Sequence, residues 1–339
     1  MIKKKIKLLL IFGIILSVTT ISITLYFVLT PQPQIKKVGQ TLSDGEAMSV
    51  KVKDGVAYVT DISNTNPGLR FVDISNPKKP IEIGSYYNKG SPVRFDFLNS
   101  TQNIVCIANY GDGLEIVDVT DFNNPFRIAH YRPGTQIVDI IIQDRIAFIG
   151  AGNNGFEILN LSIPESPSLI ASIPFSGRGC FHIEVHNDLC LTTHSDGNIG
   201  MKIFNISDLA NPILVCDYMD SSLNIWEPKI QDSFLYFGDA GDTGGIYIYN
   251  ISNLSEPTEI GRYNNGGRIH DIYLSDGFVF LANYNKGLEI VDIHDNTKPQ
   301  LILKHYDGGR SLGVFQENNL VYLADGSDGL EILQVKALL

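Results

Sequence analysis

The sequence contains few of the residues that mark disulfide-rich or zinc-binding proteins. Only four of its 339 residues are cysteine, which is too few for a disulfide scaffold at this length. Their spacing also matches no zinc finger or zinc ribbon. Three of them lie between residues 180 and 216, so the sequence leaves open either one disulfide in that stretch or buried free thiols.

Motifs for several kinds of catalysis are absent as well. There is no Gly-x-Ser-x-Gly, His-Glu-x-x-His or Cys-x-x-Cys motif, no phosphate-binding loop and no dinucleotide fingerprint. The apolar residues show no 3.6-residue period, which argues against a helical repeat.

Charge is missing altogether from residues 8–30. At about 1.5 Å per residue, this run of 23 residues is long enough to span a hydrocarbon core of about 30 Å. Four lysines precede the run and place the N-terminus in the cytoplasm. We therefore expect residues 1–30 to be the signal anchor of a single-pass cell-membrane protein, with residues 31–339 outside the cytoplasm. Cleavage of the segment is the open alternative.

Basic residues are not clustered anywhere after Lys37. The six lysines of residues 1–37 contribute +6 to a net charge of −11, so the remainder carries −17. Binding to a nucleic acid requires clustered lysine and arginine, so we expect no nucleic-acid partner.

One phrase, by contrast, occurs seven times: a glycine, an alternating apolar strand and a polar turn. The glycines recur every 42 or 45 residues and are Gly68, Gly113, Gly155, Gly200, Gly245, Gly287 and Gly329. A period of this length that contains several short strands is typical of propeller blades. Each period divides into four strands, and the blades are expected to start at about residues 45, 90, 134, 178, 222, 266 and 309.

The turn after the third strand has a repeated chemistry. An Asp or Asn ends the strand and can bond to the backbone two residues on; these residues are Asp73, Asp118, Asn160, Asn205, Asn250 and Asp292. The seventh phrase stops after its third strand, whereas residues 33–42 match the fourth-strand pattern. The sequence thus predicts an all-β, seven-bladed propeller of four-stranded antiparallel blades. Its N-terminal strand completes the last blade, and one transmembrane helix precedes it.

The phrases GLEIVDV at Gly113 and GLEIVDI at Gly287 resemble the LVIVD repeat family of prokaryotic surface and secreted proteins. The resemblance covers nearly all of the chain after residue 33 and implies a β-propeller. It implies no particular activity.

Residues at equivalent positions of the inner strands are the candidates for chemistry. They are Asp139, His182, Glu227 and Asp271, which are expected to face the central channel. Such a group could hold a divalent cation or supply an acid and a base. The alternative is a water-filled channel lined by polar side chains, and no cofactor is predicted.

Aromatic and basic residues are expected on the face formed by the loops between blades and between second and third strands. This face is the default binding surface of a propeller. The candidate binding residues are Arg94, Tyr110, His194, Trp226, Arg268, Tyr284 and Arg310.

Five Asn-x-Ser/Thr sequons are candidate glycosylation sites, at Asn99, Asn160, Asn205, Asn250 and Asn253. Three of them are also the turn residues of the repeat, so turn chemistry alone explains their presence.

These features favour a membrane-anchored binding module for a protein, a peptide or a glycan. The opposing hypothesis is a hydrolase or lyase that uses the channel carboxylates, with or without a metal. A structural component of the cell envelope is the third hypothesis, and it predicts self-association. The fold alone does not decide among them.

Overall fold

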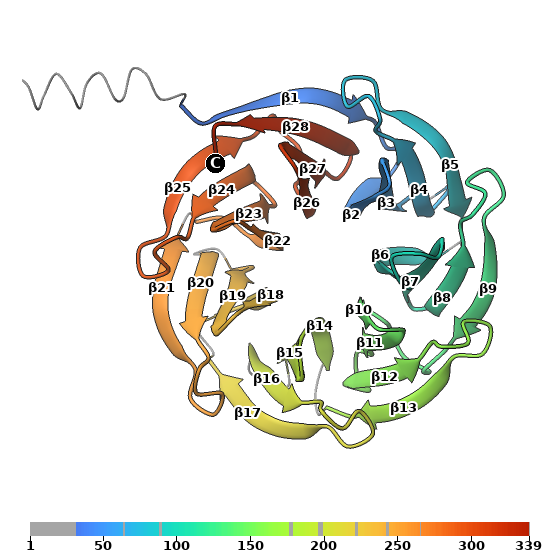
Figure 1. Ribbon diagram of the computed structural model, residues 1–339, viewed down its shortest axis with the longest axis vertical. Coiled ribbons are helices and arrows are strands. Elements are labelled where there is room, and N and C mark those ends of the chain that lie inside the picture. Colours follow the sequence, from blue (N-terminus) through green and yellow to red (C-terminus); the bar gives the residue numbers. More distant parts are fainter. Residues whose placement is uncertain are drawn as a thin grey trace, which may run out of the picture.

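The computed structural model describes residues 32–338, except for residues 64, 88–89, 176–178, 196–198, 221–222, 242–243 and 265. This part of the chain forms seven four-stranded sheets around a central axis (Figure 1). The predicted seven-bladed propeller of antiparallel blades is therefore confirmed. None of the described residues form a helix long and apolar enough to cross a membrane. The predicted anchor, residues 1–30, lies outside the described residues.

The strands follow one another from the channel to the rim in the first six blades. Blades 1 to 3 consist of β2 (Glu46–Lys53), β3 (Val56–Ile62), β4 (Gly68–Asp73) and β5 (Ile81–Tyr87); β6 (Ser91–Phe97), β7 (Ile104–Tyr110), β8 (Gly113–Asp118) and β9 (Phe126–Tyr131); and β10 (Asp139–Gln143), β11 (Ile146–Gly150), β12 (Phe156–Asn160) and β13 (Ser168–Ile173). Blades 4 to 6 consist of β14 (Cys180–His186), β15 (Leu189–Ser195), β16 (Ile199–Asn205) and β17 (Ile213–Met219); β18 (Ile225–Gln231), β19 (Phe234–Asp239), β20 (Gly245–Asn250) and β21 (Thr258–Asn264); and β22 (Ile269–Ser275), β23 (Phe278–Asn283), β24 (Gly287–Asp292) and β25 (Gln300–His305).

Blade 7 contains both ends of the described chain. It consists of β26 (Gly313–Glu317), β27 (Leu320–Ala324), β28 (Leu330–Lys336) and β1 (Gln34–Thr41). β1 pairs antiparallel with β28, from Gln34 opposite Lys336 to Thr41 opposite Leu330. The N-terminal strand thus supplies the missing outer strand, as the sequence predicts, and covers the edge that β28 would otherwise expose.

The predicted turns have the expected hydrogen bonds. Oδ1 of Asp73 accepts the N–H of Ser75 at 2.8 Å, and Oδ1 of Asn160 accepts the N–H of Ser162 at 2.8 Å. The same bond recurs at Asp118, Asn205, Asn250 and Asp292. Because the side chain fixes the turn locally, each of the first six blades ends its third strand in the same way.

The cores lie between neighbouring blades rather than within one sheet. One cluster, for example, joins Ile116 and Leu114 of blade 2 to Ile149 and Ile140 of blade 3. The glutamate of the repeated phrase is buried nearby and contacts the preceding blade, as where the Tyr131 hydroxyl donates to Glu157 at 2.9 Å. Apolar packing and these polar contacts together hold adjacent blades side by side.

Candidate functional site

The seven inner strands bring one side chain each to a common level of the channel. In five of them a β-bulge interrupts the pairing with the second strand. In each blade, the residue at or just after this position faces the axis. Six of these residues are polar: Ser49, Arg94, Asp139, His182, Glu227 and Asp271. Bulges re-aim side chains in this way and are common next to functional sites.

Glu227 has the most unusual backbone of this group. Its φ is +41°, in the left-handed region that a non-glycine residue rarely adopts, and Pro228 follows it. In β18 the pairing shifts between Trp226 and Lys229, so that Glu227 enters the channel while Trp226 lies above it. The sequence already indicated this departure from a regular strand, because its only tryptophan, Trp226, is followed by Glu227 and Pro228.

A cluster of charged residues, which we call the partition, crosses the channel. Glu227 is at its centre: Arg94 Nη2 lies 2.8 Å from Oε2, and Lys229 Nζ lies 3.0 Å from Oε1. His182 Nδ1 lies 3.1 Å from Glu227 Oε2 and 3.6 Å from Asp139 Oδ2. The structure therefore brings together three of the four predicted channel residues, Asp139, His182 and Glu227, with two basic side chains that neutralise the glutamate. The fourth, Asp271, accepts the N–H of Val314 instead.

These contacts shift the pKa values in opposite directions. Burial would raise the pKa of Glu227, but Arg94, Lys229 and His182 outweigh it and hold this pKa well below its usual range. Burial would lower the pKa of His182, but Asp139 and Glu227 outweigh it and raise this pKa. Burial, and next the charge of Glu227, raise the pKa of Asp271 to about 6.

Four channel carboxylates form a repeated link, which we call the clasp, to the next blade. Each accepts a backbone N–H from the neighbouring inner strand: Asp96 from Ile142 at 2.9 Å, Asp139 from Ile183 at 3.0 Å, Glu184 from Ile230 at 3.2 Å and Asp271 from Val314 at 2.8 Å. An inner strand has no further strand on its channel side, so the clasp supplies acceptors for its outward N–H groups. Asp139 and Asp271 therefore have a structural role that the sequence did not indicate.

The partition separates two spaces of different character. The upper pocket, about 290 Å³, is lined by residues near the start of the inner strands, among them Cys180, Trp226 and His270. The lower cavity, about 780 Å³, is lined by residues farther along the same strands, such as Phe97 and Lys229. Since inner strands start at the loops between blades, the upper pocket opens on the predicted binding face and the lower cavity on the opposite face.

The upper pocket gathers several of the predicted binding residues. Tyr110, Trp226 and Arg94 line it together with Phe181 and His270. The ring of Trp226 stacks on Phe181 at 6.3 Å and contacts His182 edge-on at 4.5 Å. Nε2 of His182 is buried and has no hydrogen-bond partner within the described part of the chain.

A second aromatic layer continues from the pocket toward blade 7. Tyr284 stacks on His270 with ring centroids 5.0 Å apart. Arg310 lies over Tyr284, donates from Nη1 to its hydroxyl at 3.1 Å and pairs with Glu46. Arg268 precedes β22, where its carbonyl accepts the N–H of Tyr284 at 2.9 Å.

His194 is placed differently from the expectation of an exposed loop residue. It lies on β15, its side chain is fully buried, and Nε2 is 3.5 Å from Asp217 Oδ1. Its ring packs edge-on against Phe175. The strand extends farther than the turn residues that follow it suggested, so this histidine does not line the pocket.

The remaining sequence candidates have plain structural surroundings. All four cysteines, Cys106, Cys180, Cys190 and Cys216, are free and buried, which decides between the two alternatives that the sequence left open. Four sequon asparagines, Asn99, Asn160, Asn205 and Asn250, accept backbone N–H groups in turns, and Asn253 accepts from the Ser255 hydroxyl.

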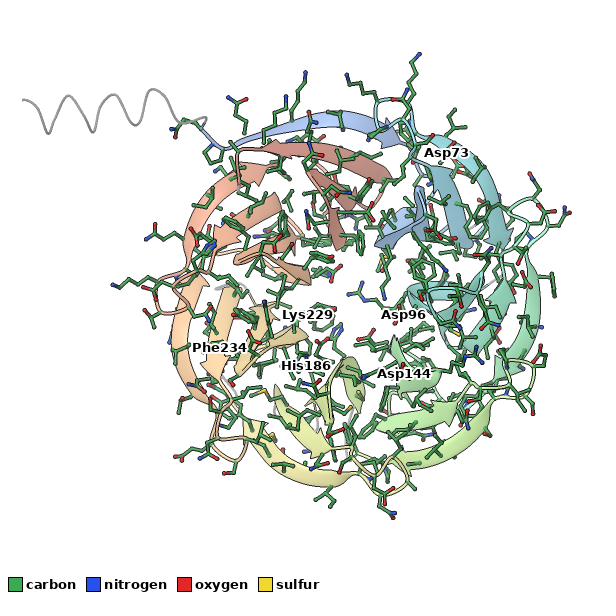
Figure 2. The ribbon with its side chains drawn as sticks, in the orientation of Figure 1. Asp73, Asp96, Asp144, His186, Lys229 and Phe234 are labelled. Atoms are coloured by element: carbon green, nitrogen blue, oxygen red, sulfur yellow. The ribbon has the colours of Figure 1, made fainter. Side chains whose placement is uncertain are left out.

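The lower cavity contains residues that the sequence reasoning missed. Lys51, Asp96, Glu184, Lys229, Tyr273 and Phe315 form a second level, two residues beyond the first along each strand. Asp96 and Lys229 lie near the axis, whereas Asp73 lies toward the rim (Figure 2). The two-residue period of a strand was the available signal, because side chains at alternate positions share a face.

Asp139, His182 and Glu227 have ligand atoms within 4.8 Å of one another, the spacing that a metal ion requires. The donor set is nevertheless poorly suited to a cation, since Arg94 and Lys229 already neutralise Glu227. A similar group outside the channel consists of Asp112, Glu115 and His130, and its glutamate also pairs with an arginine.

Comparisons with known proteins agree with the fold. The family model for the LVIVD repeat matches residues 44–88, 229–265 and 266–307, which confirms the resemblance in these three stretches, including the phrase at Gly287. No curated protein matches the sequence significantly. Among solved structures, the crystal structure of the computationally designed Ika8 protein is similar, with a TM-score of 0.64 and 8% identity over 88% of this chain and 99% of that one. At this identity the likeness concerns the fold alone.

Proposed function

We propose that these LVIVD repeats form a membrane-anchored, extracytoplasmic binding module that receives one sugar ring or one side chain of a glycan, peptide or protein in the upper pocket. The observation that carries the proposal is the set of aromatic rings around Trp226 above a buried polar floor. Aromatic faces beside polar groups suit flat, partly apolar ligand groups. A pocket of about 290 Å³ has room for one such group, while the rest of the ligand would contact the surrounding loops.

The direction of β1 supports this orientation. Gln34 starts this strand opposite Lys336, beside Val335, whose N–H bonds to the carbonyl of Asn319 in the first hairpin of blade 7. The chain therefore enters the propeller on the face where the lower cavity opens. With only Pro31-Gln32-Pro33 between the apolar run and β1, an anchor would hold this face toward the membrane and leave the upper pocket facing outward.

Channel contacts argue against the opposing enzyme hypothesis. The pKa values of Asp271 and Glu227 are shifted apart, as in acid–base pairs. However, both oxygens of Asp271 accept backbone N–H groups, from Ile272 and Val314, and both oxygens of Glu227 contact basic groups. Asp271 is thus held as a backbone acceptor and Glu227 as a neutralised ion, which differs from the free acid and base of a catalytic pair.

Trp226 allows a direct test because it is the only tryptophan. The full-length protein in detergent micelles would be titrated with chitotetraose, maltoheptaose and a tetrapeptide library while its fluorescence is recorded. We expect a saturable change with at least one probe, and Tyr110→Ala should weaken that binding about tenfold or more. Tyr87→Ala, at an exposed position of the outer strand β5, is the matched control and should have no effect. A fluorescence change that both variants retain equally would argue against the pocket.

The membrane orientation has a separate test. Since the four native cysteines are buried, Asp295→Cys in an exposed turn should be the cysteine that a membrane-impermeant maleimide labels. Labelling in intact cells is expected. Labelling only after lysis would place the propeller in the cytoplasm.

A further inference from the structure

The lower cavity has the size and the chemistry of a second, independent site. It is about 780 Å³ in volume and lies across the partition from the upper pocket. Six carboxyl groups and three basic side chains line it: Asp96, Asp139, Glu184, Glu227, Asp271 and Asp276 against Lys51, Arg94 and Lys229. The excess of carboxylates favours a ligand that brings at least one positive charge.

Asp271 is the carboxylate best placed to receive that charge. Of the five buried or half-buried carboxylates, Asp96 pairs with Lys51 at 2.6 Å, Glu184 with Lys229 at 3.5 Å and Glu227 with Arg94 at 2.8 Å. Asp139 lies 3.6 Å from His182. Asp271 is bonded only to backbone N–H groups and has no basic side chain at ion-pair distance among the described residues.

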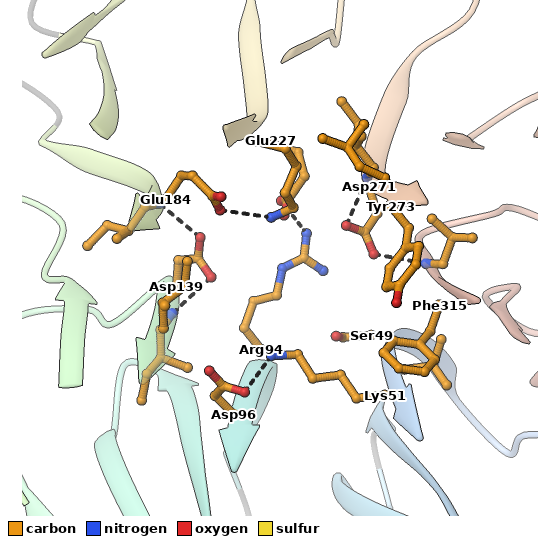
Figure 3. Close-up of a pocket in the computed structure, with 18 of the residues that line it drawn as sticks. Ser49, Lys51, Arg94, Asp96, Asp139, Glu184, Glu227, Asp271, Tyr273 and Phe315 are labelled. Carbon is orange, nitrogen blue, oxygen red and sulfur yellow. Dashed lines mark hydrogen bonds and ion pairs between the residues drawn. The ribbon is translucent and has the colours of Figure 1, made fainter. Parts of the chain in front are cut away.

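An aromatic wall stands beside Asp271. Tyr273 and Phe315 meet edge to face with ring centroids 5.0 Å apart, and both rings border the cavity next to the carboxylate (Figure 3). An ammonium group at Asp271 would also lie against these rings, whose faces attract cations. Apolar atoms of the same ligand could pack on them.

Hydrogen-bond donors remain free on the other side. Arg94 uses Nη2 for its bonds to Glu227 and to the carbonyl of His270, so Nη1 and Nε have no partner within the described residues. Its guanidinium group reaches into the middle of the cavity (Figure 3). Lys51 keeps a third of its side chain exposed and, within the described part of the chain, donates a hydrogen bond only to Asp96. These donors fit a carboxylate group.

We propose that the lower cavity binds a small zwitterion of the α-amino-acid type, with its ammonium group at Asp271, its carboxylate at Arg94 and Lys51, and an apolar side chain on Tyr273 and Phe315. The site is separate from the upper pocket, because it opens on the opposite face and, apart from Arg94, which borders both spaces, different residues line it. A dicarboxylate would leave Asp271 without a counter-ion, and a diamine would leave the Arg94 donors unused.

The test uses three probes that differ by one charge. Isothermal titration calorimetry of the full-length protein in micelles would compare L-phenylalanine, N-acetyl-L-phenylalanine, which lacks the ammonium group, and L-phenylalaninamide, which lacks the carboxylate. We expect L-phenylalanine to bind, and each derivative to bind about tenfold more weakly or worse, as loss of one charge-assisted hydrogen bond implies. Equal binding of either derivative, or no binding of any probe, overturns the proposal.

Variants locate the site within the protein. Asp271→Asn keeps an oxygen for the Val314 N–H but removes the charge, and should weaken L-phenylalanine binding about tenfold or more. Asp325→Asn is the matched control, since Asp325 is also buried but does not border the cavity. If Asp271→Asn does not fold, Tyr273→Leu tests the aromatic wall with the same expected direction. Binding that survives both substitutions places the ligand elsewhere and overturns the proposal.

Discussion

The two ends of the channel differ in size and in the residues that line them, although the seven blades that form both ends share one repeated pattern. The upper pocket is small and lined mostly by apolar and aromatic side chains, whereas the lower cavity is more than twice as large and has nine charged side chains in its lining. Both are built from the same inner strands, at positions only a few residues apart. The difference shows that a repeated scaffold can present two different chemical environments along its axis, on either side of the Arg94–Glu227–His182 partition.

Breaking the partition should have the largest effect. Glu227→Gln would leave Arg94 and Lys229 without the carboxylate that they share, and an uncompensated buried charge costs about 3–5 kcal/mol. Urea unfolding of the full-length protein should therefore show a loss of stability of that order. Glu256→Gln, in an exposed turn, is the control. A loss below about 1 kcal/mol would mean that the partition is hydrated and that the two spaces communicate.

Testing a variant of each site with the ligand of the other site would show whether the two sites are separate. Trp226→Ala should weaken the ligand of the upper pocket about tenfold to a hundredfold, the usual effect of removing a central aromatic anchor, and leave L-phenylalanine binding unchanged. Tyr273→Leu should do the reverse. Calorimetry of both variants with both ligands checks this. If one substitution weakens both ligands, the channel is a single site.

The clasp predicts an intermediate effect on stability. Asp139→Ala would leave the buried N–H of Ile183 without an acceptor, at a cost of about 1–3 kcal/mol. Asp139→Asn retains an oxygen acceptor and should cost less than half as much. Urea unfolding of the pair separates the hydrogen bond from the charge. Equal losses for the two variants would assign the effect to charge and not to the clasp.

The sequence predicted the blades because their turns are fixed locally. A glycine, an Asx turn and a proline recur in nearly every repeat, and each acts on its own neighbours, so one chain was enough to count seven blades and to find β1 as the closing strand. Asp139, His182, Glu227 and Asp271 were also predicted to face the channel, because the first strand of every blade must do so.

The clasp and the burial of His194 could not be predicted in the same way. The clasp joins Asp139 to Ile183, residues of different blades whose separation varies from one blade to the next. The burial of His194 depends on where β15 ends, and the ends of strands are the least certain part of a sequence-based assignment. The lower cavity was not predicted because one residue of each inner strand was assigned to the channel, although the residue two positions on faces the same channel.

The smallest expected effect is a pH dependence of stability that comes from one buried aspartate on each face of the propeller. Burial raises the pKa of Asp271 in the lower cavity and of Asp325 near the loop face, both to about 6. Glu227 adds to this shift at Asp271, while Arg94 and Lys229 oppose it. Unfolded aspartate titrates near 3.9, so between about pH 4 and pH 6 the folded protein binds more protons than the unfolded protein.

The contribution of each of these two groups to stability should therefore fall as pH rises through this window, by on the order of 1–2 kcal/mol, while the lowered pKa of His270 acts in the opposite direction. Urea unfolding at pH 4.5 and at pH 6.5 measures the fall. Asp271→Asn and Asp325→Asn should each remove their own share of it, and the double variant should remove both, because the two groups lie on different faces and share no partner. A fall that one substitution removes entirely would show that the two faces titrate as one unit, and it would contradict the separation that the partition implies.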